Sequence, residues 1–301
     1  MSGSLIALLS ALCFAASNIC TRRGVLRIRD AALGGYVSVF IAPPLFLLVA
    51  LIIGDLHNIG QFTWKGYLWL AMAGIIHFVA GRSSSYWSLK YLGANMASVF
   101  SGLNLVYTIL LGFFVLGEHV TRNMVLGSVL IIIGPSLLAW PQKSGTPGSK
   151  VEDGDKPRLS RKGIMAALIS GIFFGISPLF IKWGLQEGGS ALAGTFVSYT
   201  SATLILGMTM LNPTRKGDVI HMEHRALLWF SFSGIFVGLA QFLRFSALKL
   251  TQISIAGPLI ATSRVWLLLL SFIVNRKVES FRINVVVGTI LTMLGAVLVY
   301  R

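Results

Sequence analysis

The chain has 301 residues, of which 55% are hydrophobic and only 12% are charged, and its formal net charge at pH 7 is +15. Soluble domains carry roughly 25% charged residues, so a water-soluble fold could not cover this much apolar surface. The cations stand at the ends of apolar runs rather than in one basic segment, which argues against nucleic acid as a partner and for anionic lipid headgroups.

Apolar windows recur along nearly the whole chain, and a bilayer-spanning helix needs about 20 mostly apolar residues. The first window has no basic segment before it and is repeated in mid-chain, so we interpret it as a span rather than a cleaved signal peptide. The windows predict ten spans, at 3–21, 33–53, 66–84, 95–116, 123–140, 163–182, 191–211, 226–246, 252–274 and 282–300.

A Pro/Gly/Ser-rich and highly charged stretch at 141–162 follows the fifth span and predicts a solvated linker. It divides the chain into a first repeat at 1–140 and a second repeat at 163–301. The opening "ALLSALCFAASNICTRRGV" of residues 7–25 returns as "ALISGIFFGISPLFIKWGL" at 167–185. Each repeat therefore contains five predicted spans.

An odd number of spans per repeat means that the second repeat enters the membrane from the opposite face. Inverted repeats of this kind build secondary transporters, with the substrate site at the midplane between the halves. The sequence therefore predicts an all-α integral membrane fold, with ten transmembrane helices as an inverted 5+5 repeat around a central cavity.

Three segments carry a resemblance to a known family: "SALCFAASNICTRRG", "SLKYLGANMASVFSGL" and "LGEHVTRNMVLGSVLIIIG". They resemble the EamA branch of the drug/metabolite transporter superfamily. The second repeat departs from the last segment, with "NRKVES" where the first repeat has "LGEHVT". The resemblance implies ten helices, a central cavity and alternating access. It does not select a cargo, because amino acids, nucleotide sugars and sugar phosphates all occur in the family.

Arg264, in "IATSRVWLLLL", is the strongest single site candidate. It stands about 10 residues from either end of the ninth span, roughly 15 Å at 1.5 Å per residue. An arginine at the bilayer centre costs at least about 2.5–3.5 kcal/mol, so we expect it to face a cavity or a partner.

None of the 10 acidic residues lies in mid-span, where it could neutralise Arg264. Three interpretations stay open: helix carbonyls satisfy the guanidinium, the missing anion is the substrate, or the span is misplaced. The same absence argues against an exporter of cationic drugs, which needs a membrane-embedded acid. Anionic or zwitterionic cargo, such as an amino acid, an organic acid or a phosphorylated metabolite, fits better.

Other polar residues inside or near the ends of spans are supporting candidates for substrate binding. For each of them, the alternative is a hydrogen-bonded packing residue or a cation facing the headgroups. His77, in the third span, is expected to hydrogen-bond a neighbour, and Gln241 precedes one candidate by one turn. The supporting candidates are Asn104, Tyr107, Ser263, Trp266, Asn18, Arg82 and Arg244.

Enzyme chemistry has little support in the sequence. His221, Glu223 and His224 stand close together in "HMEHR", but they lie in a connection with no further ligands. No phosphate-binding glycine loop, zinc-protease helix or nucleophile paired with a base is present. We therefore predict no enzyme activity, no cofactor and no bound metal.

The sequence predicts a secondary transporter of a small metabolite in the plasma membrane, whose partners are its substrate, the bilayer and, as an open candidate, a second copy of the chain. The alternative is a membrane protein that does not transport, such as a lipid-handling scaffold or receptor. Most Lys and Arg residues follow odd-numbered spans, which places both termini outside, whereas members of the family more usually keep both in the cytoplasm.

Overall fold

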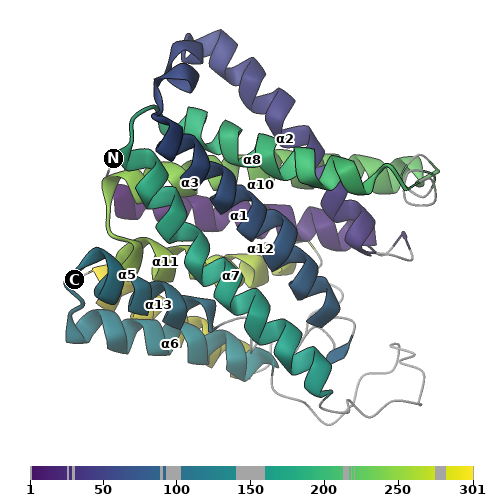
Figure 1. Ribbon diagram of the computed structural model, residues 1–301. Coiled ribbons are helices and arrows are strands. Elements are labelled where there is room, and N and C mark those ends of the chain that lie inside the picture. The colour runs from purple at the N-terminus through teal and green to yellow at the C-terminus, as the bar shows by residue number, and fades with distance from the viewer. Residues whose placement is uncertain are drawn as a thin grey trace.

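The computed structural model describes residues 2–25, 27–28, 31–88, 91–92, 103–139, 160–212, 217, 219, 221–274 and 283–300. These residues form helices joined by short connections (Figure 1). In chain order the helices are α1 (Gly3–Val25), α2 (Ala31–Ile53), the 3₁₀ helix η1 (Leu56–Gln61), α3 (Trp64–Gly74), the π-helix η2 (Ile75–Gly81), α5 (Asn104–Leu116), α6 (Arg122–Ala139), α7 (Arg161–Gln186), α8 (Ala191–Thr209), α10 (His224–Leu250), α11 (Ile253–Ala261), α12 (Ser263–Val274) and α13 (Ile283–Tyr300).

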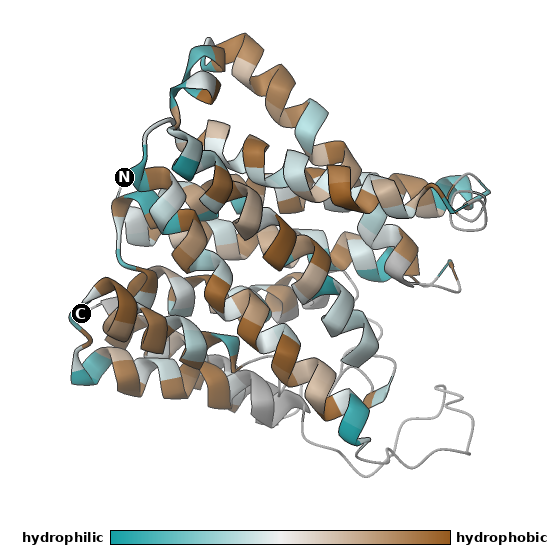
Figure 2. Ribbon diagram, in the orientation of Figure 1, coloured by the Kyte–Doolittle hydropathy of each residue, from teal (hydrophilic) through white to brown (hydrophobic). Residues whose placement is uncertain are grey.

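The all-helical part of the prediction is confirmed. Helices α1, α2, α7, α8 and α10 are each long and apolar enough to cross a membrane. Shorter apolar helices lie on the predicted fourth, fifth, ninth and tenth spans. The beginning of the fourth span, at 95–102, lies outside the described residues. Hydrophobic residues occupy much of each helix (Figure 2), and many of the large ones are exposed, as expected of helices that face lipid.

Two predicted spans are interrupted rather than continuous. The third passes from α3 into the π-helix η2, where the N–H of Arg82 reaches back to the carbonyl of His77. The ninth divides at Thr262, the C-cap residue of α11, whose hydroxyl donates to the Leu259 carbonyl at 2.7 Å. A proline does not by itself interrupt a helix here, because α2 continues through Pro43 and Pro44 and α7 continues through Pro178.

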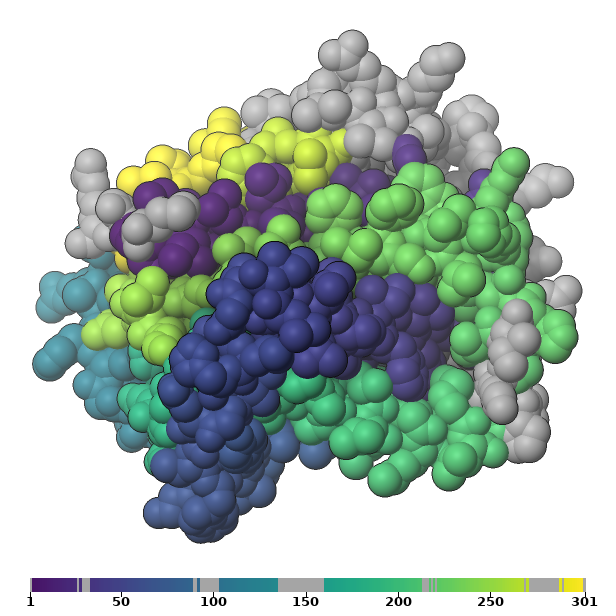
Figure 3. Space-filling view, turned by 90° about the horizontal axis from the view of Figure 1, so that it is seen from above, coloured from purple at the N-terminus to yellow at the C-terminus, as the bar shows by residue number. Residues whose placement is uncertain are grey.

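The two halves that the sequence predicts to be repeats interleave, because most helices of one half pack against helices of the other. Helix α1 packs on α10, α3 on α7, α2 on α8 and α6 on α13. Contacts also join α5 to α7 and α12 to α1, and they join α3 to α8 and α10 to α2. In the view from above, α2 and η1 are visible on one face of the molecule together with parts of α8 and α10 (Figure 3). Any binding site in the interior is therefore shared by both repeats.

Glycines allow the closest of these approaches. A Cβ atom built on Gly74 of α3 would lie 1.9 Å from the carbonyl oxygen of Ser198 on α8. The corresponding atom on Gly234 of α10 would lie 3.0 Å from the carbonyl oxygen of Ser38 on α2. Membrane helices associate closely where small residues let the backbones meet, and these two crossings follow that rule.

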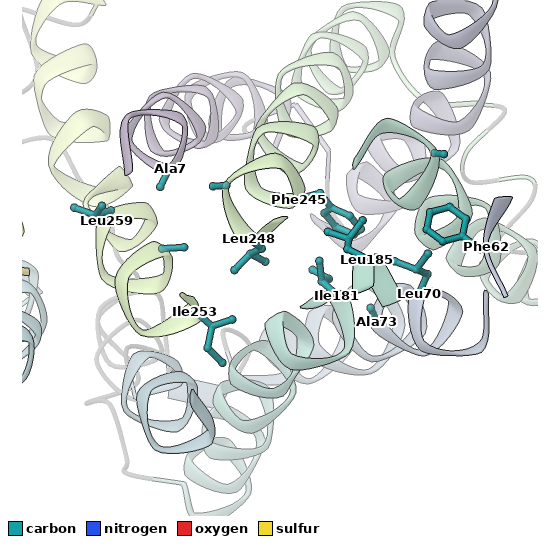
Figure 4. Packing of buried hydrophobic residues seen from close by; sticks show 13 residues of the cluster. Ala7, Phe62, Leu70, Ala73, Ile181, Leu185, Phe245, Leu248, Ile253 and Leu259 are labelled. Carbon is teal, nitrogen blue, oxygen red and sulfur yellow. The ribbon is translucent and has the colours of Figure 1, made fainter. Parts of the chain in front are cut away.

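A large apolar cluster fills the bundle near the end at which α7 and α10 end and α3, α8 and α11 begin (Figure 4). We call this the Glu118 end, because Glu118 lies there between α5 and α6. The cluster joins both repeats. Its buried residues are Ala7, Phe62, Leu70, Ala73, Ile181, Leu185, Ala193, Phe245, Ala247, Leu248, Ile253, Ala256 and Leu259.

Candidate functional site

The π-helix η2 carries His77 into the interior of the bundle. A π-turn is wider than an α-turn and often occurs at functional sites. The imidazole ring of His77 lies 4.8 Å from the ring centroid of Phe78 and 4.9 Å from that of Phe174 on α7. Aromatic rings thus lie on two sides of this partly buried histidine.

Two side chains of α10 contact the ring nitrogens of His77. The side-chain amide nitrogen of Gln241 lies 3.0 Å from Nε2, and Nη1 of Arg244 lies 3.3 Å from Nδ1. Gln241 and Arg244 are one helical turn apart, and their exposed fractions are only 1% and 7%. The expectation that His77 hydrogen-bonds a neighbour is confirmed, and the neighbours are polar side chains of the second repeat.

Arg82 approaches the same histidine from the end of η2. Its guanidinium donates a hydrogen bond to the Ser38 hydroxyl at 3.3 Å and stands 6.0 Å from the ring centroid of Phe78. Arg82 and Arg244 both lie within electrostatic range of His77 and of the hydroxyl of Tyr199 on α8. Two cations, the partly buried Arg82 and the buried Arg244, thus act on the same histidine and tyrosine.

We call the group His77, Arg82, Tyr199, Gln241 and Arg244 the arginine cluster. Tyr199 is fully buried, and its ring packs against Phe78 at a centroid distance of 4.3 Å. Within the part of the chain that the structure describes, no ion pair involves either arginine of the cluster, and the Tyr199 hydroxyl has no hydrogen-bond partner. An arginine cluster of this kind has the chemistry to bind an anion.

The candidates of the first repeat's α5 pack against α7. A Cβ atom built on Gly175 of α7 would lie 2.6 Å from Cβ of Tyr107 and 2.8 Å from the carbonyl oxygen of Asn104. Thr108 tightens the same crossing by donating to the Gly175 carbonyl at 3.2 Å. Phe174, which touches His77, immediately precedes this glycine, so α7 separates α5 from the arginine cluster.

The remaining candidates belong to a different helix pair. Ser263, Arg264 and Trp266 lie in the first turn of α12, directly after the break at Thr262. Helix α12 packs on α1, which carries the exposed Asn18. Arg264 is partly buried, and it forms no hydrogen bond or ion pair with any other residue that the structure describes.

Glu118 is a structural residue whose partner the sequence did not reveal. Its carboxylate is buried and accepts hydrogen bonds from the backbone N–H groups of Ile253, at 2.8 Å, and Ser254, at 2.9 Å. The Ser254 hydroxyl donates to the same carboxylate at 2.6 Å. Glu118 thereby caps α11, whose own N-cap residue, Gln252, makes no side-chain cap.

Lys182 of α7 holds the other side of the same connection. Its ammonium group donates to the carbonyl oxygens of Leu248, at 2.8 Å, and Thr251, at 2.6 Å, at the end of α10. Unpaired carbonyls at a helix C-terminus favour a cation, so this contact stabilises the end of α10. The turn between α10 and α11 is thus fixed by an acid from one repeat and a base from another helix.

Residues 1–140 and 161–301 match a family model described as the EamA-like transporter family. An uncharacterized transporter of Clostridium kluyveri is 22% identical over 249 residues, which cover 80% of this chain and 74% of that protein. A probable transport protein of Saccharomyces cerevisiae is 31% identical over 155 residues, which cover 48% of this chain and 43% of that protein.

A solved crystal structure has the same fold. Its chain superposes with a TM-score of 0.77 at 17% sequence identity, and the superposition covers 98% of this chain and 95% of that chain. The arrangement of helices is therefore shared along nearly the entire length.

Proposed function

This chain belongs to the EamA-like transporter family, and we propose that it is a secondary transporter that moves a small anionic or zwitterionic metabolite across the plasma membrane by alternating access. The chain is a multi-pass integral membrane protein, and it is a transporter rather than an enzyme. The proposal concerns its cargo, its mechanism and its membrane.

The arginine cluster is the observation that carries the proposed cargo. Two guanidinium groups lie near His77, and Arg244 is almost fully buried. A buried cation without a partner is costly, since desolvation is repaid only by an opposite charge or by good hydrogen bonds. An anionic group on the cargo supplies that charge. The cluster is built by η2 and its C-cap residue from the first repeat and by α8 and α10 from the second, so movement of one repeat against the other would expose it.

Helix directions support the proposed inverted repeat, in which residues 1–140 and 163–301 are joined by the linker 141–162. The start of α1 and the end of α7 lie at the same turn, because Gly3 and Lys182 both contact Thr251. These two helices, which begin the two repeats, therefore run in opposite directions (Figure 1).

Equivalent contacts between the repeats also support this symmetry. Trp69 of α3 contacts Trp183 of α7 at a ring-centroid distance of 5.0 Å. The sequence repeat aligns these two positions with Trp229 of α10 and Arg23 of α1, and the guanidinium of Arg23 lies 4.8 Å from the Trp229 ring centroid. Matching pairs at both ends of the bundle are expected from a two-fold axis in the membrane plane.

The apolar cluster supports alternating access, because it separates the arginine cluster from the Glu118 end. Ala73 stands one turn before His77 on the path from that end, and Leu248 stands one turn beyond Arg244. Cargo bound at the arginine cluster would meet a wall of buried apolar side chains in this direction. Passage to the Glu118 end therefore requires the two repeats to move apart there.

We keep the other candidate residues as proposals of unequal support. Arg82 and Arg244 are proposed to contact the anionic group, whereas Arg264 is proposed to bind an anion on the α12 side. The cavity wall is proposed to include Asn104, Tyr107, Ser263, Trp266 and Asn18. A homodimer is a further proposal, and the mass of the detergent-purified particle, corrected for bound detergent, tests it.

Counterflow in proteoliposomes tests the proposed function. The cargo panel contains amino acids, organic acids, phosphorylated metabolites and cationic dyes. We expect saturable, stereoselective uptake of an anionic or zwitterionic compound, which falls at least about tenfold in Arg244→Gln. Arg225→Gln is the matched control, since Arg225 is an exposed arginine near the start of the same helix. Uptake of cationic dyes alone, or anion uptake that is equal in both variants, contradicts the proposal.

A further inference from the structure

We propose that the arginine cluster is a site for a dianion, that is, for a cargo whose oxyanion groups carry two negative charges in total. This inference rests on the proposed transport function and narrows the class of its substrate. The dianion can be a single phosphate monoester group or two carboxylates. Both forms carry two negative charges, and the groups that enter the site only accept hydrogen bonds.

The charge balance of the cluster is the first observation. Arg82 and Arg244 carry two positive charges, and an arginine stays charged in proteins. The acidic residues that the structure describes lie at the ends of helices rather than beside the cluster; they are Asp55, Glu118, Glu187 and Glu223. A monoanion would compensate only one of the two charges, of the partly buried Arg82 and the buried Arg244, whereas a dianion neutralises both.

The hydrogen bonds of His77 give a second, independent observation. A neutral imidazole has one N–H and one acceptor nitrogen, whereas a guanidinium only donates. If the Gln241 amide nitrogen donates to Nε2, then Nδ1 carries the hydrogen and faces the donor of Arg244. The second end of the Gln241 amide, opposite the one that faces Nε2, lies 3.4 Å from Nη1 of Arg244. If the amide is turned so that its oxygen faces Nε2, its NH₂ group therefore faces Arg244. In either orientation two donors face each other.

This surplus of donors favours a ligand that brings further acceptors to the cluster. Among the described residues, Tyr199 is 0% exposed, and its buried hydroxyl has no hydrogen-bond partner. Arg82 uses one of its five N–H groups on Ser38. An oxyanion offers several lone pairs and no donor, so it would satisfy Arg82, Arg244 and Tyr199 together.

The apolar surroundings of the cluster favour a ligand whose charge balances the two arginines. Phe78 and Phe174 pack on the ring of His77, and the apolar cluster closes the direction of the Glu118 end. Charges interact more strongly where water is excluded, and an unmatched charge costs more there. We therefore expect the cluster to discriminate between ligands that differ by one negative charge.

Binding to the purified full-length protein at pH 8 tests the inference with two matched pairs of probes. Methyl phosphate and succinate are dianions at this pH, and dimethyl phosphate and succinamate are the corresponding monoanions. We expect each dianion to bind at least about tenfold more tightly than its partner, by calorimetry in detergent. The ratio of the two affinities in each pair is expected to be near one in Arg82→Gln and Arg244→Gln and unchanged in Arg225→Gln. Arg82→Lys, which keeps the charge, is expected to retain most of the preference.

The outcomes separate this inference from the proposed function. Equal binding of both members of each pair to the folded wild-type protein overturns the inference, whether or not the arginine variants fold. Transport of a monoanion or zwitterion, without binding of either dianion, overturns the inference and leaves the proposed function standing. Tight dianion binding that depends on both arginines, without flux in proteoliposomes, supports the site and contradicts transport. A preference for methyl phosphate over succinate, or the reverse, supports the inference and identifies whether the charges lie on one group or two.

Discussion

The carboxylate of Glu118 lies 2.9 Å from the backbone nitrogen of Ser254 and accepts the hydrogen bond that this N–H donates. An acid in the connection between two helices of the first repeat thus caps a helix of the second repeat. The contact lies at the Glu118 end, beyond the apolar cluster that closes the interior in that direction. It therefore couples the stability of α11 to the packing of the two repeats.

We predict that Glu118→Gln destabilises the protein by about 1–3 kcal/mol, the usual cost of leaving a buried hydrogen-bonding group unpaired. The amide has one acceptor oxygen for the N–H groups of Ile253 and Ser254, and its NH₂ group would face one of these donors. Thermal unfolding in detergent, followed by tryptophan fluorescence, measures the effect. The control is Glu223→Gln, which removes only the exposed pair with Arg27 and should cost no more than about 1 kcal/mol. Equal effects of the two substitutions contradict the capping role.

We predict that Lys182→Met destabilises the same turn and that its effect is not additive with that of Glu118→Gln. Lys182 satisfies the carbonyls of Leu248 and Thr251, two residues that precede the helix capped by Glu118. Residues that hold one element show coupling energies of about 0.5–3 kcal/mol. A double-mutant cycle of unfolding free energies tests this coupling.

Lys249→Met is the matched control for the Lys182 substitution. Lys249 lies at the end of α10, the helix whose last carbonyls Lys182 binds, but it donates to the Gly189 carbonyl from an exposed position. Its loss should have a small effect that adds independently to that of Glu118→Gln. Additive effects of Lys182→Met and Glu118→Gln would mean that the two side chains act on separate elements.

We predict that Gly74→Ala reduces the yield of folded protein sharply. The added Cβ would lie 1.9 Å from the backbone carbonyl of Ser198, and a backbone atom cannot turn away as a flexible side chain can. Overpacking costs typically about 1–3 kcal/mol, and here it would force α3 and α8 apart beside the arginine cluster. Size-exclusion chromatography of the fluorescently tagged protein measures the folded fraction. Gly207→Ala on α8 is the control, because its new Cβ would meet no atom closer than 3.9 Å.

The position of most helices follows from hydropathy alone, but the two interruptions do not. The π-turn at His77 and the break at Thr262 depend on which carbonyl accepts each N–H, and no residue type marks that choice in the sequence. Prolines do not locate such interruptions either, since α7 continues through Pro178.

The composition of the candidate site was readable from the sequence, but its convergence was not. Arg82 and Arg244 could be identified as cations in predicted spans. Their approach to His77 depends on the packing of η2 against α8 and of α8 against α10, which brings residues 77 and 244 together across the two repeats. Glu118 shows the same limit, because its partners lie about 135 residues further along the chain.

The last prediction concerns Arg264, which has no hydrogen-bond or ion-pair partner among the described residues. If this guanidinium binds an anion of the cargo, Arg264→Gln removes an uncompensated charge from the span and breaks no hydrogen bond or ion pair with the described residues. We therefore expect unchanged or higher thermal stability together with at least about tenfold weaker transport. Arg161→Gln, at the exposed start of α7, is the control and should change neither quantity. A fall in stability with transport intact would instead identify Arg264 as a structural residue bonded to backbone carbonyls, which was the alternative that its sequence position left open.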